Sequence, residues 1–451
     1  MLNKYIGILA QRLEAGNTVA LYCYGIFASH ILCTLEKLSG KLPAVVIDND
    51  ERKRGRADFG VPVMPFEEAR ERYSGLQYFI CSDDFKYTII GDMLEKGVSP
   101  EEIINYIPVE KDLTCLPIRN RLLIDLYPKS AQVHGIQSCC EASFENSLQA
   151  AQSSIQVPAE DEKYDGLENI LSAELSRYDR GEVDICKSCA LRQEQYIVRK
   201  GYKKRYKQIA FYQQSCADCL AHCVYCCAGA SDKNLRASAE FQTDSLEYYA
   251  AFVDKLLSLG WIDDDFTCAV DMSERDSDKK IGFVVNSLQK ANLTPMLYKV
   301  GSCLLTYSKN LEDLLRQGSV YIIWSLDAGS RETYRKIKQI DAFNQVVENV
   351  KRYIQADAFH GRFIVAKYLI VKGVNDREEE FDAYLLLVTE LGLKYVSISF
   401  NFFIEADEFD LEFIRRCYSK IVACGLQLTN KNNSEAVTKA LAMLSMRRQS
   451  L

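Results

Sequence analysis

The sequence predicts an α/β protein in which a partial (β/α)6 barrel of the TIM type follows a small parallel α/β domain. Short apolar runs alternate with helix-like segments over residues 18–110, and the same alternation resumes after Lys207 and continues to about residue 425. The chain has 451 residues and 48% hydrophobic content, so it can bury more than one core. We therefore expect an α/β domain at 1–110, a connector at 111–205, the barrel at 206–425 and a C-terminal tail at 426–451.

The first domain is built on three strand-like runs, TVALYCYG, LPAVVID and LQYFICS, each followed by a helical pattern. Its first turn, from Cys23 to Ala28, keeps only Gly25 of the glycines that let a backbone approach a pyrophosphate. We therefore expect no dinucleotide binding there. Asp48 ends the second strand at the place of a ribose-binding acid, although a plain turn role explains it as well. Recognition or oligomerisation is the expected task of this domain.

The connector has weak periodicity, and Ala150–Asp165 is rich in Gln, Ser, Glu and Asp, which predicts an irregular loop. The basic run Arg199–Lys207 is interpreted as solvated. A net charge of -7 disfavours nucleic-acid binding, because that affinity depends on neutralising phosphates with Lys and Arg. No stretch approaches the roughly 20 apolar residues of a membrane span, and we expect a cytoplasmic protein with neither signal peptide nor anchor.

The barrel region supplies six apolar strands: QIAFYQ, DFTCAV, PMLYKV, VYIIWSLD, RFIVAKYLIV and KYVSISF. Helical patterns separate them, for example at Phe343–Ile354 and Glu378–Leu391. In such barrels the chemistry lies at the carboxyl ends of the strands. Functional residues are therefore expected just after each strand.

Seventeen cysteines in a long chain without a secretion signal indicate metal or cluster binding more than disulfides. Several cysteines sit singly in apolar segments and are expected to be ordinary core residues. These are Cys23, Cys33, Cys81, Cys417 and Cys424.

Cys219, Cys223 and Cys226 form the pattern C-x3-C-x-aromatic-C in the loop that leaves the first barrel strand. This pattern at this place resembles the radical S-adenosylmethionine (radical SAM) superfamily. The resemblance implies a 4Fe-4S cluster on these three thiolates, whose fourth iron chelates S-adenosylmethionine. It also places Tyr225 near the adenine. Structural zinc is the alternative, because Cys216 extends the run to CxxC-x3-CxxC, but three residues between the pairs are few for a tetrahedral site.

The segment from Ile322 to Lys338 resembles the fourth-strand region of the branch that carries auxiliary-cluster SPASM domains. By this resemblance Ser325 and Asp327 would touch the ribose of the cofactor and Lys367 would lie near the methionyl carboxylate. Helix capping and a paired core charge are the plain alternatives. The resemblance further implies cofactor contacts for Ser273, Glu274 and Asn401, with Met272-Ser273-Glu274 standing where the family has Gly-Gly-Glu.

A second metal site is predicted from Cys186-x2-Cys189 and the pair Cys139-Cys140, which lie before the barrel. A second Fe-S cluster and a zinc ion both remain open. The segments VVIDNDERKRG and FGVPVMPFEEA also resemble the small Rossmann-like domain found beside sugar acyltransferases and some methyltransferases.

Together these resemblances imply a radical SAM enzyme with a flavodoxin- or ferredoxin-like electron donor. Its substrate would be a peptide or protein, or a carbohydrate or nucleotide-sugar. The alternative function is a non-catalytic metal-binding scaffold, bearing zinc or Fe-S, in which the altered Met272-Ser273-Glu274 stretch marks lost cofactor binding.

Overall fold

The computed structural model describes most of the chain, and the chain forms two compact units. The first unit comprises 1–212, 244–270 and 283–298, and the second comprises 213–243, 271–282 and 299–451. The described residues are 3–82, 85–114, 121–127, 130–134, 155–158, 193–199, 202–204, 206–213, 219–225, 246–271, 274, 276–400 and 411–429. The expected boundaries at 110, 205 and 425 stay predictions.

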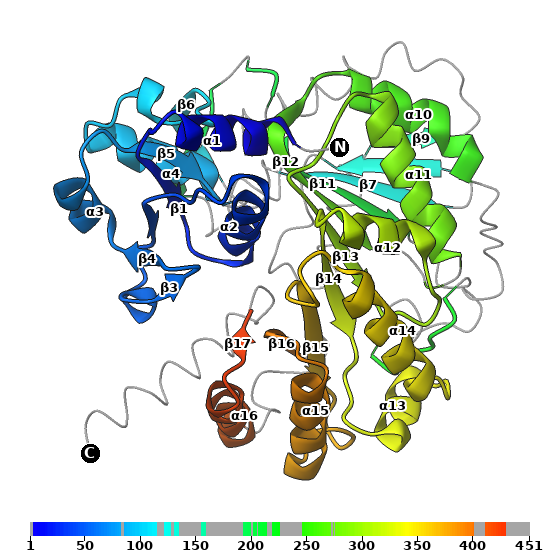
Figure 1. Ribbon diagram of the computed structural model, residues 1–451. Helices are drawn as coiled ribbons and strands as arrows, with labels where there is room; N and C mark the ends of the chain where they lie inside the picture. Colours follow the sequence, from blue (N-terminus) through cyan, green and yellow to red (C-terminus); the bar gives the residue numbers. More distant parts are fainter. Residues whose placement is uncertain are drawn as a thin grey trace. The chain divides into compact units, whose positions relative to one another are not determined.

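A small, mostly parallel sheet forms the beginning of the first unit (Figure 1). Its strand order is β3-β4-β2-β1-β5, with parallel pairing throughout except between β3 and β4. Strand β1 lies between β2 and β5, and its Ala20 pairs with Val45 on one side and Tyr78 on the other. The strands are β1 Val19–Tyr22, β2 Val45–Ile47, β3 Ala57–Asp58, β4 Val61–Met64 and β5 Gln77–Ile80.

Helices cover both faces of this sheet, so its strands are buried on both sides as the apolar runs predict. The helices are α1 Lys4–Glu14, α2 Ile26–Ser39, α3 Phe66–Arg72 and α4 Lys86–Glu95, with 3-10 turns at η1 Glu51–Lys53 and η2 Pro100–Glu102. The Asn3 side chain caps α1 by accepting a 2.8 Å hydrogen bond from the Tyr5 N–H. Gly40, with φ of 64°, ends α2 in the left-handed conformation.

Asp48 has a turn role at the end of β2. Its Oδ2 accepts hydrogen bonds from the Tyr24 N–H and from Lys53 Nζ, both 2.8 Å long. Its Oδ1 accepts another from the Asp50 N–H at 2.9 Å. The carboxylate is therefore occupied by the protein's own donors, in agreement with the turn interpretation of this residue.

The segment 111–205, expected to be irregular, contains strands in its described parts. β6 (Val109–Thr114) pairs with β10 (Gln193–Val198), and β7 (Arg121–Tyr127), β8 (Ser130–His134) and β9 (Ile155–Pro158) form an antiparallel meander. The expectation of a loop over 150–165 is thus wrong at β9. Polar residues interrupt these short strands, which weakens the alternation by which strands are recognised.

The predicted β/α series follows, and its strands match the six apolar runs. In the first unit it comprises β11 Tyr206–Gln213, α10 Leu246–Ser258, β12 Ile262–Asp271, α11 Ser277–Lys290 and the start of β13 Leu297–Ser302. In the second unit it continues with α12 Lys309–Arg316, β14 Val320–Ser325, α13 Arg331–Lys338, α14 Phe343–Ala356, β15 Ile364–Ile370, α15 Glu378–Glu390, β16 Tyr395–Phe400, α16 Leu411–Ala423 and β17 Gln427–Leu428.

The strands β14, β15, β16 and β17 lie side by side in chain order, and each neighbouring pair is parallel (Figure 1). Helices connect them, so each strand returns in the same direction as the one before. The predicted fold class, a parallel β/α series of the partial-barrel kind after a small parallel α/β domain, is confirmed. The carboxyl ends of β14, β15 and β16 therefore lie along one edge of the sheet.

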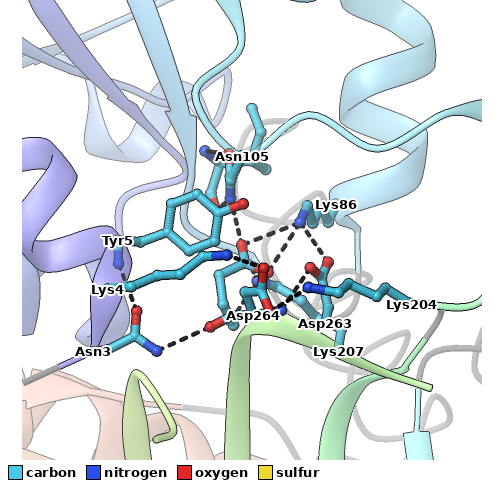
Figure 2. A network of polar contacts seen from close by, with 11 residues as sticks. Asn3, Lys4, Tyr5, Lys86, Asn105, Lys204, Lys207, Asp263 and Asp264 are labelled. Carbon is cyan, nitrogen blue, oxygen red and sulfur yellow. Dashed lines mark hydrogen bonds and ion pairs between the residues drawn. The ribbon is translucent and has the colours of Figure 1, made fainter. Parts of the chain in front are cut away.

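A buried charge network joins α4 to β11 and β12 within the first unit (Figure 2). Lys86 Nζ contacts the carboxylates of Asp263 at 2.8 Å and Asp265 at 3.0 Å, and Lys207 also pairs with Asp265. The side chains of both lysines are fully buried. The expectation that Arg199–Lys207 is solvated is therefore wrong for Lys207, because the acids of β12 balance its charge inside the protein.

The singly placed cysteines divide between core and surface. Cys33, Cys81 and Cys417 are buried as expected, Cys23 is half-buried, and Cys424 is exposed, which contradicts its expected core role. Cys424 follows the last turn of α16, where the chain reverses toward β17. Within the described ranges, every helix is too short or too polar to span a bilayer.

Candidate functional site

The cysteine loop, residues 219–225, rests on the carboxyl end of helix α13. The His222 N–H donates a 3.0 Å hydrogen bond to the Lys338 carbonyl, and the Val224 N–H donates a 2.9 Å bond to the Ile337 carbonyl. The last carbonyls of a helix have no partner within it, so they are available to a neighbouring segment. α13 ends here because Gln339 adopts φ of 55°, and the loop takes up the carbonyls that this leaves free.

Tyr225, the last described residue of this loop, forms a polar cluster with the buried side chains of Asp327 and Lys338. The Tyr225 hydroxyl donates to Asp327 Oδ2 at 2.5 Å. Lys338 Nζ donates to the same carboxylate oxygen at 2.6 Å and to the Tyr225 hydroxyl at 2.7 Å. The side chains of Asp327 and Lys338 have no exposed surface. Burial alone would raise the pKa of Asp327, but Lys338 and Lys367 hold it below its ordinary value, so the pair is charged.

Asp327 itself sits at a constrained position after β14. It has φ of 59°, which is uncommon for a residue with a side chain. The Leu369 N–H donates to its Oδ1 at 2.8 Å, and the Asn375 side-chain amide donates to its carbonyl, also at 2.8 Å. Its own N–H donates to the Lys367 carbonyl at 3.0 Å. Both carboxylate oxygens of Asp327 thus serve to join β14, β15 and the cysteine loop.

The two described thiols of the loop differ in their surroundings. Cys219 and Cys223 are both half-buried. A hydrogen bond with the buried Cys303 thiol, at the end of β13, lowers the pKa of Cys223 to about 7. Burial raises the pKa of Cys219, and a hydrogen bond with the main chain of Glu274 partly offsets that rise. Cys223 is therefore the better thiolate donor at neutral pH.

The Glu274 carboxylate accepts hydrogen bonds from the turn that follows β13. Its Oε1 accepts hydrogen bonds from the Ser302 hydroxyl at 2.8 Å and from the Cys303 N–H at 2.5 Å. Its Oε2 accepts the Leu305 N–H at 3.1 Å. Burial raises the pKa of this carboxyl despite these donors. The Glu274 side chain thus holds the strand end that carries Cys303, while its main chain reaches Cys219.

Ser325, Lys367 and Ser397 stand in register across β14, β15 and β16. All three are half-buried, and alternation along the strands puts them on the same face of the sheet. The charge of Lys367 acts on Asp327 and on Asp271, at the end of β12. The Asp271 side chain reaches solvent, although the protein around it raises its pKa. This face therefore carries a row of polar groups beside the cluster of Asp327.

Several expected site residues meet in this region, and others lie outside the described part of the chain. The loop cysteines Cys219 and Cys223 lie beside Tyr225, Glu274 and Asp327 through the contacts above, with Ser325 and Lys367 on the adjoining face. The expected residues outside the described ranges are Cys139, Cys140, Cys186, Cys189, Cys226, Ser273 and Asn401. Among the residues that are described, no three Cys, His, Asp or Glu side chains are grouped closely enough to hold a metal.

Sequence reasoning missed Cys303, Lys338 and Asn375. Cys303 follows the third barrel strand directly, so its place at a carboxyl end was a usable signal. Lys338 ends a helix among other charged residues and offers no such signal. Asn375 acts through side-chain bonds to the main chain of Asp327 and Leu369, which sequence spacing alone does not reveal.

Comparisons with known proteins give structural likenesses only. No protein-family model matches the chain, and no curated protein matches it. Streptococcus suis SuiB bound to S-adenosylmethionine aligns at 11% identity and a TM-score of 0.38, covering 74% of each chain. A radical SAM methyltransferase from Sphaerobacter thermophilus aligns at 15% identity and a TM-score of 0.38, covering 55% of this chain and 72% of its own.

HydG, a maturase of the [FeFe]-hydrogenase, aligns at 14% identity and a TM-score of 0.36, covering 51% of this chain and 52% of its own. Likenesses at this level do not identify a family. The functional proposal therefore depends on the cysteine loop and on the contacts that hold it.

Proposed function

We propose that this chain is a radical SAM enzyme in which Cys219, Cys223 and Cys226 hold a 4Fe-4S cluster and the carboxyl ends of the barrel strands bind S-adenosylmethionine. The observation that carries the proposal is the cysteine loop. Two backbone hydrogen bonds hold this short segment against α13, and it carries two half-buried thiols. Thiolates are the ligands that Fe-S clusters take, and three of them leave one iron open. The donor set therefore fits such a cluster.

When bound and reduced, the cluster would supply one electron for the cleavage of S-adenosylmethionine to methionine and a 5'-deoxyadenosyl radical, and that radical would remove a hydrogen atom from the substrate. The chain's own residues would bind and orient S-adenosylmethionine. Lys367 offers an ammonium group on the polar face to a carboxylate, and the in-register Ser325 and Ser397 hydroxyls both donate and accept hydrogen bonds. Through its main chain, Glu274 would orient Cys219.

The contacts of Asp327 favour a supporting role over a direct cofactor contact. Both of its carboxylate oxygens accept hydrogen bonds from the protein, and its side chain is fully buried. We propose that Asp327 fixes the end of β14, and that Ser325 on the adjoining face makes any ribose contact. Tyr225 would still present its ring edge to an adenine while its hydroxyl stays tied to Asp327.

The deciding experiment is anaerobic reconstitution of the full chain with iron and sulfide. Wild-type protein should bind about four irons for this cluster, and with dithionite and S-adenosylmethionine it should release 5'-deoxyadenosine even without substrate. The control is the triple replacement of Cys219, Cys223 and Cys226 by Ala, which should lose those irons and the product. A reconstituted wild type that releases no 5'-deoxyadenosine and binds no S-adenosylmethionine would favour the scaffold function instead.

We further propose that Cys186 and Cys189, with Cys139 or Cys140, bind a second metal centre. The support is their CxxC spacing. Metal analysis of the triple alanine variant tests this proposal. Residual iron with sulfide identifies an auxiliary cluster and zinc identifies a structural site, whereas a metal-free variant rejects both.

A flavodoxin- or ferredoxin-like protein in the cytoplasm would supply the electron. For the substrate, the likeness of the first domain to neighbours of sugar-modifying enzymes favours a carbohydrate or nucleotide-sugar. The likeness of Ile322–Lys338 to the SPASM branch favours a peptide or protein. Acceleration of 5'-deoxyadenosine release by one class of compound and not the other would decide between them.

A further inference from the structure

Lys338 contacts the cysteine loop through both its main chain and its side chain. Its carbonyl accepts the His222 N–H at 3.0 Å, next to Cys223. Its Nζ donates at 2.7 Å to the hydroxyl of Tyr225, two residues after Cys223. The two contacts therefore lie on either side of Cys223. A buried lysine is costly unless it is paired, and here Asp327 provides the balancing charge at 2.6 Å.

Both charges of this pair lie beside the cysteine loop. The Tyr225 hydroxyl, two residues after Cys223, contacts Lys338 Nζ at 2.7 Å and Asp327 Oδ2 at 2.5 Å. Neither side chain of the pair has exposed surface. The field of each charge therefore acts on the loop from within the protein. Because water is excluded around both side chains, this field is screened far less than a surface charge would be.

We propose that Lys338 is a positioning residue that fixes Cys223 and Tyr225, and that its buried positive charge raises the reduction potential of the cluster held by the loop. The proposal rests on the function proposed above. One-electron reduction adds a negative charge to the cluster, and a nearby cation stabilises the reduced form. Asp327 opposes this effect, so the two residues set the potential in opposite directions.

The test is a redox titration of the cluster in the reconstituted full chain, followed by electron paramagnetic resonance. Lys338→Met keeps the length of the side chain and removes its charge, so its midpoint potential should be more negative. Asp327→Asn keeps the shape and leaves the ammonium unopposed, so its midpoint should be more positive. We expect at least a tenfold change in the ratio of reduced to oxidised cluster for each, which is about 59 mV for one electron.

Lys336→Met is the matched control, because Lys336 lies on the same helix with its side chain 56% exposed and paired to Glu332. It should leave the midpoint unchanged. A general loosening of the loop would shift the midpoint potentials of Lys338→Met and Asp327→Asn in the same direction, whereas a charge effect shifts them in opposite directions. If Lys338→Met binds no iron, the sign of the Asp327→Asn shift still decides.

The outcomes separate this inference from the proposed function. A wild type that takes up no iron overturns both. A wild type that loads its cluster, with unchanged midpoints in the variants or shifts of the same sign, overturns the role of Lys338 alone. Opposite shifts with an unchanged Lys336→Met control establish it.

Discussion

Gly329 and Glu380 meet without room for a side chain between them. The Gly329 N–H donates a 2.6 Å hydrogen bond to Glu380 Oε1, and a Cβ on Gly329 would overlap the Glu380 carbonyl oxygen. Glu380 also accepts the Ser330 N–H at 2.9 Å, so α15 holds the start of α13. Close approach of these backbones fixes the turn that carries Asp327.

We expect Gly329→Ala to destabilise the protein by about 1–3 kcal/mol, because the added methyl group must push the backbone of α15 away. Urea unfolding of the full chain measures this change. Gly7→Ala is the matched control, since Gly7 lies in α1 and an added methyl group there would have no atom within 4 Å. That variant should be stabilised by up to about 1 kcal/mol through helix propensity. Equal effects at the two glycines would contradict the packing argument.

Glu274 has a carboxylate whose two oxygens accept three protein donors. Glu274→Gln replaces one acceptor oxygen by an NH2 group, which leaves a buried donor without a partner. We expect a loss of about 1–3 kcal/mol in unfolding free energy and faster alkylation of Cys303 by a thiol reagent.

Glu348→Gln is the control for this change, since the Glu348 side chain is 64% exposed and pairs only with Lys351 among the contacts described. Its effect should stay within about 0.5 kcal/mol, as for most surface substitutions. An unchanged alkylation rate of Cys303 in Glu274→Gln would show that Glu274 does not hold that strand end.

The sequence was sufficient for features that depend on local pattern. Apolar runs at regular spacing placed β11 to β16, because strands buried on both faces are nearly continuous in hydrophobic residues. The loop with Cys219 and Cys223 was found from its spacing alone. The meander β7–β9 was missed, because its short strands carry polar residues and its pairing is antiparallel.

The roles within the site depend on contacts between distant segments, and these leave little trace in local sequence. Asp327 stood at an expected position, but it contacts both Lys338, 11 residues further along the chain, and Tyr225, 102 residues before it. Lys207 was interpreted as a surface charge because its neighbours along the chain are basic. Its partner Asp265 comes from the next strand, so burial of the charge was visible only in the fold.

Lys86 offers a test of the buried network in the first unit. It contacts two carboxylates, and its side chain is fully buried (Figure 2). Lys86→Met leaves Asp263 and Asp265 with one compensating charge fewer, and removing one partner of a buried pair costs about 3–5 kcal/mol. Thermal and urea unfolding should show this loss.

Lys4→Met is the control for this network. Lys4 pairs with Asp264, but its side chain is 56% exposed, so the change should cost at most about 1 kcal/mol. Similar losses for the two lysines would mean that burial does not set the strength of the network.

From the turn around Asp48 we predict that the full chain does not bind NAD or NADP. Cys23, not glycine, occupies the turn after β1 with φ of 81°, at the place where close approach of a phosphate to the backbone calls for glycine. Asp48, the residue at the place of a ribose-binding acid, already accepts hydrogen bonds from Tyr24, Asp50 and Lys53.

Asp48→Ala should therefore lower the unfolding free energy by about 1–3 kcal/mol, because the Tyr24 and Asp50 N–H groups lose their acceptor. Glu51→Ala, at the exposed start of η1, should not. Calorimetric titration with NAD, NADP and nucleotide-sugars should give no heat of binding for either dinucleotide. Tight NAD binding that Asp48→Ala abolishes would show that the carboxylate exchanges its internal donors for a ribose, and the turn interpretation would then be wrong.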